Sequence, residues 1–303
     1  MVWVHHQAID FELGQEFRIY PTADWQLEGK TADLEYIKSW VGKVSEDENG
    51  MAMFLGDIQD NDRPSTRSLK RKAFHERPEV LLDETRARLK ELDSEIVPLL
   101  LPLAKMRLPM LGMLAGHHYA DLYFEKDGQL VKQTSTNYIC QQLTLLSGRE
   151  VPYLGIMSAW VHLSFRKKGS TSTIKKLLHI QHGVGGGGTP EAAVRRLRKT
   201  SEGHYADAYV RAHDCQQVIV RMCVNEPLGH GENARIRQRE ILMMNIGSAT
   251  AGPVITRGDP DYSEMEMMNP VPRGWGVISV NMRRASRHDD DSRNCFAELH
   301  GKL

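Results

Sequence analysis

Several short β-prone runs in this chain each end in a loop that carries an aspartate or a histidine. The residues that follow these runs are Asp24, Asp57, His117 with His118, His182 and His213. In open α/β sheets, ligands bind outside the carboxyl ends of the strands, so residues far apart in the sequence converge there. The pattern therefore indicates an α/β fold with one site at the ends of its strands.

The spacing of apolar residues predicts the elements between these loops. Strands are expected over 17–22, 51–55, 153–165, 173–180, 206–210, 218–224, 236–246 and 276–282. Helices are expected over 32–44, 79–105 and 136–146, with another that Thr189 and Pro190 open, since proline suits a first helical position. The run 108–115 is a further apolar segment that ends at a glycine.

Composition narrows the class of protein. Of the 303 residues, 41% are hydrophobic and 26% are charged, which excludes a disordered, collagen-like or coiled-coil chain. The 39 basic residues balance the 39 acidic ones, so any nucleic acid, membrane or acidic partner must be bound locally. Prolines and charges interrupt the most apolar stretch, 97–114, so we expect no membrane span. The N-terminus lacks a secretory profile, and we expect a cytoplasmic protein.

The residue types at the strand ends suit a metal. Aspartates and histidines without a cysteine cluster favour a first-row divalent ion such as Mn, Fe, Zn or Ni over a structural zinc. The four cysteines, Cys140, Cys215, Cys223 and Cys295, are scattered and would be free thiols in a reducing compartment. We therefore expect one or two divalent ions per chain.

The order of the motifs carries a resemblance to a known family. The motifs are Asp24-Trp25-Gln26, Gly56-Asp57-Ile58-Gln59-Asp60, Gly116-His117-His118-Tyr119, His182-Gly183 and Ala212-His213-Asp214-Cys215. Over about residues 17–283 they resemble the calcineurin-like metallophosphoesterase superfamily, and the stretch 182–213 resembles most its bacteriophage and prophage members. The resemblance implies a four-layer α/β/β/α sandwich of two mixed sheets in a single domain, 1–303, with a helical insertion over about 66–107 and a polar tail over 284–303.

The resemblance also implies two sets of metal ligands. The first ion would be bound by Asp24, Gln26, Asp57 and Cys215, and the second by Asp57, His117, His182 and His213. Gln26, His117 and Cys215 stand where the family has His, Asn and His. Since each replacement can still coordinate a metal, we interpret the changes as retuning of the site.

The implied activity is hydrolysis of a phosphoester, as a phosphodiesterase acting on a nucleotide or nucleic acid through a metal-bridging hydroxide. Asp57 would bridge the ions and His118 would act as the general acid. Arg63 and Arg67, in a basic run, would contact the substrate. If the protein is phage-encoded, the compartment would be the host cytoplasm. The sequence sets no oligomeric state.

Other interpretations stay open. The chain could be a catalytically degenerate phosphoesterase-fold protein that only binds a ligand or partner. The run 183–188 fits a G-x-G-x-x-G dinucleotide motif, with Asp207 at a suitable distance, as in an oxidoreductase. Asp24 and Asp57 could be helix caps, His117 and His118 a polar turn, and Cys215 a small buried hydrophobe.

Overall fold

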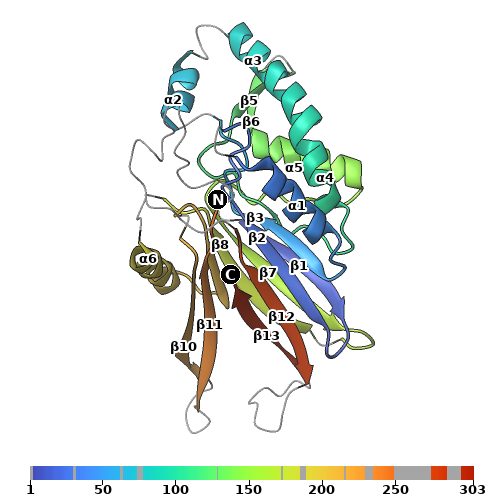
Figure 1. Cartoon of the computed structure of the whole chain (residues 1–303), viewed down its shortest axis with the longest axis vertical. Coiled ribbons are helices and arrows are strands. Elements are labelled where there is room, and N and C mark those ends of the chain that lie inside the picture. Colours follow the sequence, from blue (N-terminus) through green and yellow to red (C-terminus); the bar gives the residue numbers. More distant parts are fainter. Residues whose placement is uncertain are drawn as a thin grey trace.

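The computed structural model describes residues 3–29, 32–61, 64–73, 78–127, 129–171, 173–184, 189–214, 216–228, 235–248, 274–284 and 295–303. These residues form a mixed α/β protein in which two mixed sheets predominate over the helices (Figure 1). The prediction of two mixed sheets is confirmed. None of the described helices combines the length and the apolar character that crossing a membrane requires.

The larger sheet has six strands, whose spatial order differs from their order in the chain. They are β1 (Trp3–Phe11), β7 (Ser158–Lys167), β8 (Thr173–Gln181), β9 (Ala208–Arg211), β11 (Arg235–Asn245) and β10 (Val218–Leu228), in that spatial order. The strand β9 pairs in parallel with both of its neighbours, β8 and β11. The loops that follow β8 and β9 therefore leave the same edge of the sheet.

The smaller sheet has five strands. In spatial order they are β13 (Cys295–Lys302), β12 (Val277–Arg284), β2 (Glu16–Thr22), β3 (Gly50–Phe54) and β4 (Gly112–Met113). The strands β2, β3 and β4 run parallel, so the loops after them also meet at one edge. A separate hairpin joins β5 (Asp121–Lys126) to β6 (Gln129–Thr134).

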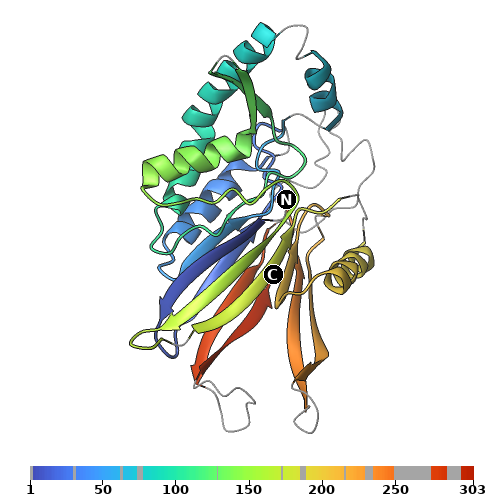
Figure 2. The same ribbon diagram turned by 180° about the vertical axis from the view of Figure 1, so that it is seen from behind.

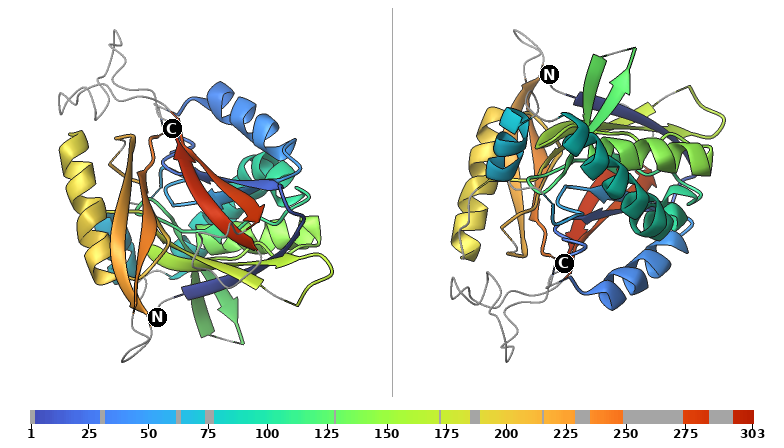
Figure 3. Two further views of the ribbon diagram at one scale, coloured as in Figure 1. Left: turned by 90° about the horizontal axis from the view of Figure 1, so that it is seen from below. Right: turned by 90° about the horizontal axis from the view of Figure 1, so that it is seen from above.

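The two sheets share one hydrophobic core, and Figure 3 shows the molecule along its long axis. Alternate residues of β2, such as Phe17 and Ile19, are fully buried, as are those of β7. The ring of Phe17 lies 5.6 Å from the ring of Phe165 on the other sheet. Every residue of β3 is buried, as expected for a central strand that is covered on both faces.

Helices pack against both sheets (Figure 2). The helix α1 (Leu34–Ser45) lies on β3 and buries Ile37, Val41 and Val44, and its N-cap Asp33 accepts a hydrogen bond from the backbone N–H of Tyr36. The helix α5 (Ser135–Ser147) contacts β4. On the other sheet, α6 (Pro190–Gly203) packs over β9, β10 and β11 through Ala193 and Leu197.

The predicted helical insertion corresponds to several helical segments. These are α2 (Pro64–Ala73), α3 (Pro78–Glu91), the short π-helix η1 (Leu92–Ile96) and α4 (Val97–Ala104). In Figure 1, α2 and α3 project from the body beside the β5–β6 hairpin. In contrast, α4 buries Leu100 and Leu103 in the main core and contacts α1 and α5, so it belongs to the body of the fold.

Part of the segment 284–303, which the sequence analysis describes as a polar tail, is a strand. Residues 295–302 form β13, which pairs antiparallel with β12 along its whole length. Ala297 is buried and Leu299 packs against the core, and this alternation holds an otherwise polar segment in the sheet. The strand β1 and the β5–β6 hairpin were also not predicted. The apolar run 108–115 forms a strand only at Gly112–Met113.

Candidate metal centre

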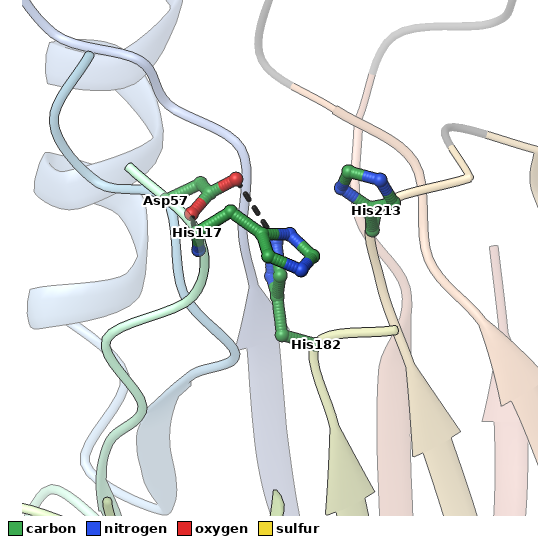
Figure 4. A group of neighbouring side chains, drawn as sticks. All are labelled: Asp57, His117, His182 and His213. Carbon is green, nitrogen blue, oxygen red and sulfur yellow. Dashed lines mark hydrogen bonds and ion pairs between the residues drawn. The ribbon is translucent and has the colours of Figure 1, made fainter. Parts of the chain in front are cut away.

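Four of the predicted ligands lie together at the strand ends (Figure 4). Asp57, His117, His182 and His213 each offer one ligand atom, and these atoms all lie within 4.8 Å of one another. They follow β3, β4, β8 and β9 respectively, so both sheets contribute. The three imidazole rings have centroids between 4.8 and 5.1 Å apart. The described residues therefore contain a group that could hold a metal ion.

Asp57 is held rigidly at the centre of the group. Its Oδ1 accepts hydrogen bonds from the backbone N–H groups of His117 and His118, the latter at 2.9 Å. Its Oδ2 lies 2.9 Å from Nε2 of His182. Burial alone would raise the pKa of the Asp57 carboxyl, but the contacts with His182 outweigh burial and lower this pKa to about 2. Asp57 is thus an ionised carboxylate at neutral pH.

The ring of His182 is oriented by the backbone. Its Nδ1 lies 2.8 Å from the carbonyl oxygen of Leu55, to which an N–H at that position donates. This directs Nε2 toward Asp57, and the side chain is fully buried. Histidines that bind metals usually donate their other ring N–H to an acceptor of this kind, which fixes the tautomer and the ring orientation. Burial lowers the pKa of His182, but Asp57, with smaller contributions from Asp24 and the Leu55 carbonyl, outweighs burial and raises this pKa above its ordinary value.

Three buried polar atoms of the group lack a hydrogen-bond partner within the described part of the chain. They are Oδ2 of Asp57, Nδ1 of His117 and Nε2 of His182. Two of them, Oδ2 of Asp57 and Nε2 of His182, face each other at 2.9 Å and form an ion pair. Buried polar atoms nearly always have hydrogen-bond partners, so the convergence of these three atoms favours a bound ligand. One carboxylate and three imidazoles fit a divalent first-row metal ion.

The other two histidines favour their neutral forms. Burial, followed by the neighbouring His182, lowers the pKa of His213 to about 4. The same two causes, in the same order, lower the pKa of His117. Neutral imidazoles present the lone pairs that a metal ion requires.

The backbone of the group is strained. Asp24, Gln26, Asp57 and His213 all adopt left-handed conformations, with φ of 52°, 46°, 52° and 78°. Non-glycine residues rarely take such conformations, which persist where the surrounding structure enforces them and cluster at functional sites. Gly116 explains part of the constraint, because a Cβ at this position would lie 2.1 Å from Oδ1 of Asp57.

The structure does not bring the whole predicted first ligand set into this group. The buried carboxylate of Asp24 accepts a hydrogen bond from the backbone N–H of His213 at 3.1 Å, and burial raises its pKa to about 7. The backbone N–H of Gln26 donates to the carbonyl oxygen of Asp57. Asp24 and Gln26 therefore border the group, and their roles as ligands stay predictions. Cys215 lies outside the described residues.

His118, the predicted general acid, lies next to the group. Its Nδ1 is 2.9 Å from Oδ1 of Asp60, and its side chain is 19% exposed. The hydrogen bond to Asp60 raises the pKa of His118 above its ordinary value. The sequence analysis placed Asp60 in a motif but gave it no role, although its position three residues after Asp57 in the same loop was a usable signal.

Arg67 is buried in the structure. Its Nη1 donates to the carbonyl oxygens of His117 and Tyr119, both at 2.8 Å, and its guanidinium stacks over the Tyr119 ring at 3.9 Å. Arg67 thus supports the loop that carries His117, and its predicted contact with substrate stays a prediction. Arg63 lies outside the described residues.

The dinucleotide interpretation gains no support. Residues 185–188 of the glycine run lie outside the described residues. The carboxylate of Asp207 accepts hydrogen bonds from the backbone N–H of Leu177 at 2.8 Å and from Arg239 at 3.3 Å. Its oxygens are therefore engaged within the protein, whereas the dinucleotide interpretation requires them to bind a ribose.

Comparison with known proteins contradicts the predicted family. The family model that matches is that of initiation factor eIF2 gamma, C terminal, over residues 219–284, and it is not a phosphoesterase model. No curated protein matches the chain. The prediction of a calcineurin-like metallophosphoesterase of phage type is therefore wrong, and the predicted phosphoester hydrolase function falls with it. The predicted phosphoester partner and the cytoplasmic location stay predictions.

The matched segment is a small part of this fold. It spans roughly a fifth of the chain and includes β10, β11 and β12. Two of these strands belong to the six-stranded sheet and one to the five-stranded sheet, so the described part of the segment is not a separate domain. None of the four clustered residues falls within it. The metal centre is therefore judged by its own geometry.

Proposed function

We propose that this protein binds one divalent first-row transition-metal ion through Asp57, His117, His182 and His213, and that it is a metal-dependent enzyme. The observation that carries the proposal is the convergence of four ligand atoms within 4.8 Å of one another, three of them buried and without a hydrogen bond among the described residues. A buried polar atom that makes no hydrogen bond costs roughly 1–3 kcal/mol. A bound ion would remove that cost.

The donor set favours Zn, Fe, Mn or Ni. Three imidazole nitrogens, which are borderline donors, outnumber the one hard carboxylate oxygen, so the set suits these ions better than Ca or Mg, which prefer oxygen ligands. One ion per chain is the number that the four-residue group supports. A second ion would need Asp24 and Gln26, which border the group.

The residues around the ion would have separate tasks. A bound ion supplies Lewis acidity, which polarises a substrate oxygen or lowers the pKa of a bound water. Asp57 holds the site negative and is itself fixed by two backbone N–H groups. Asp60 holds the His118 ring through Nδ1, so Nε2 is the nitrogen that would exchange a proton with substrate. We therefore assign His118 as the acid–base residue.

Metal titration tests the proposal. The metal-free protein is titrated with Zn, Mn, Fe(II) and Ni by calorimetry, and bound metal is then counted by elemental analysis. We expect one ion per chain in the wild type, a loss of binding in His182→Gln, and retained binding in His118→Asn. The matched control is His179→Gln, which removes a buried histidine of β8, the strand that His182 follows. A wild type that binds none of these metals refutes the proposal.

For the fold, we propose the predicted four-layer α/β/β/α arrangement. The contacts of α1 with β3 and of α6 with β9, β10 and β11, on two sheets that share a core, support this arrangement. A crystal structure tests it, and helices packed on the inner face of either sheet would contradict it.

A further inference from the structure

A buried arginine lies beneath two of the loops that carry metal ligands. Arg211 is the last residue of β9 and is 5% exposed. Its neighbours in register are Gln181, the last residue of β8, and Asn245, the last residue of β11. His182 follows Gln181 directly, and His213 lies two residues after Arg211. Arg211 therefore lies at the same edge of the sheet as the loops that carry His182 and His213.

The guanidinium contacts both of these loops at once. Its Nη1 donates to Oε1 of Gln181 and its Nη2 to the carbonyl oxygen of Val184, each at 3.3 Å. Its Nε donates to Oδ2 of Asp214 at 3.2 Å. The first two contacts lie on either side of His182 in the sequence, and the third lies next to His213. One rigid, planar group thus links the two ligand loops.

Asp214 completes the link from the other side. Its side chain is fully buried, and its Oδ1 accepts from Arg196 of α6, while its Oδ2 accepts from Arg211. Thr200, also on α6, donates to Oε1 of Gln181 at 3.2 Å. The helix α6 therefore anchors both ends of the arrangement. Removal of either guanidinium would strongly destabilise this arrangement, because it would leave an uncompensated charge on a buried carboxylate.

The backbone at Gly183 is closely packed against Arg211. Gly183 has φ of +80°, and a Cβ there would lie 2.8 Å from Nη2 of Arg211 and 2.8 Å from the carbonyl oxygen of Ala212. The guanidinium of Arg211 accordingly packs directly against the backbone of Gly183, the residue after His182. A displacement of Arg211 would be passed directly to the loop that carries this histidine.

We propose that Arg211 is a positioning residue that, with Asp214, fixes the separation of His182 and His213 and thereby sets the affinity and geometry of the metal site. The inference rests on the proposed metal binding. An arginine is needed because three N–H groups must point in three directions from one plane, which a lysine ammonium on a flexible stem does not reproduce. Arg211 touches neither the ion nor substrate in this role.

Cobalt spectroscopy tests the proposal. The metal-free wild type, Arg211→Lys and Arg211→Gln are titrated with Co²⁺, whose visible absorption reports coordination geometry, and the thermal midpoint of each metal-free protein is recorded. We expect Co²⁺ affinity to fall roughly 10–100-fold in both variants, as on loss of groups that orient ligands, with a changed absorption spectrum. The matched control is Arg18→Lys, because Arg18 makes a two-pronged ion pair with Asp47 at 2.6 Å, at the start of β2 and away from the strand ends. It should lower the thermal midpoint and leave the spectrum unchanged.

The outcomes separate the two proposals. Folded Arg211 variants with wild-type affinity and spectrum overturn the positioning role while leaving metal binding intact. A wild type that binds no Co²⁺ overturns both. If Arg211→Gln does not fold, Asp214→Asn provides the second test, since it keeps the side-chain volume and removes the charge that pairs with Arg211. A Co²⁺ spectrum unchanged in Asp214→Asn would likewise count against the proposal.

Discussion

Two groups of histidines, one where the strand ends of both sheets meet and one on the six-stranded sheet, differ in what surrounds them. At the strand ends, His117, His182 and His213 converge on the carboxylate of Asp57. Farther back, His179 on β8 is 2% exposed and has neither ring nitrogen hydrogen-bonded within the described residues.

The second group is held by ring contacts. His179 stacks on His204 with ring centroids 4.6 Å apart and meets the Trp160 ring edge-on at 4.5 Å. No carboxylate joins it in any metal-binding group of the described residues. Burial, followed by His204, lowers the pKa of His179 to about 4, so it stays neutral and packs as an aromatic ring. The contrast shows that a buried, unpaired imidazole indicates a metal site only where ligand atoms converge on a charge.

The largest expected effect separates the groups by removing that charge. Asp57→Asn should weaken metal binding by more than roughly 100-fold, since losing a ligand costs more than losing a group that only orients one. Calorimetric titration with Zn²⁺ measures the change. Asp47→Asn is the control, because it removes another carboxylate that accepts several hydrogen bonds. If Asp57→Asn bound Zn²⁺ with wild-type affinity, the Asp57 carboxylate would not be what distinguishes the first group of histidines from the second.

The next effect concerns the close packing of the ligand loops. Gly116→Ala should lower stability by well over the roughly 1–2 kcal/mol of left-handed strain alone and weaken metal binding, because its Cβ would meet Oδ1 of Asp57 at 2.1 Å. Gly14 has a similar φ, +85° against +80°, but no atom lies within 4 Å of its added Cβ. Gly14→Ala therefore reports the strain alone. Urea denaturation measures the free energy of unfolding of both variants. Equal losses of stability in the two variants would show that the packing at Gly116 is loose.

A pH series tests the neutral state of His179. Its folded-state pKa of about 4 lies below the ordinary 6.5, so the unfolded chain binds more protons between these values. Stability from this residue is therefore complete above pH 6.5 and is lost as the pH falls toward 4, by at most about 3 kcal/mol at 1.36 kcal/mol per pKa unit. The metal-free His179→Phe variant should show a correspondingly shallower fall between pH 7 and pH 4.5 in urea denaturation. An identical slope in wild type and variant would contradict the assignment.

The smallest effect is expected at the exposed end of the stack. His204→Ala should change stability by no more than about 0.5 kcal/mol, as is usual for surface positions, and leave metal affinity within twofold. Because His204 helps to lower the pKa of His179, that pKa should rise in the variant. Titration of the histidine ring protons by NMR measures the shift. A loss of metal binding would show that the two groups are coupled.

The sequence alone was sufficient to predict that four side chains meet at the strand ends. A β-prone run followed by Asp57, His117, His182 or His213 marks a strand end, and the structure places these four residues together. Apolar spacing likewise predicted α1, β2 and β3 close to their observed bounds. Such patterns depend on neighbouring residues, which is why they are visible before folding.

The family assignment failed for a related reason. Each motif was only a few residues long and several ligand positions had changed, so the order of strand-end residues could suggest a site without establishing a family. The matching family model covers 219–284, a segment that the motif argument did not use except for its strands.

Tertiary structure decided the rest. Only the fold placed Asp24 beside the group instead of within it, joined His118 to Asp60, and buried Arg67 under the His117 loop. It also drew residues 295–302 into a sheet through pairing with β12, a partner that their polar sequence does not reveal. These outcomes depend on contacts between residues far apart in the chain. Such contacts stabilise the fold only after the two sheets have packed together and excluded the water between them.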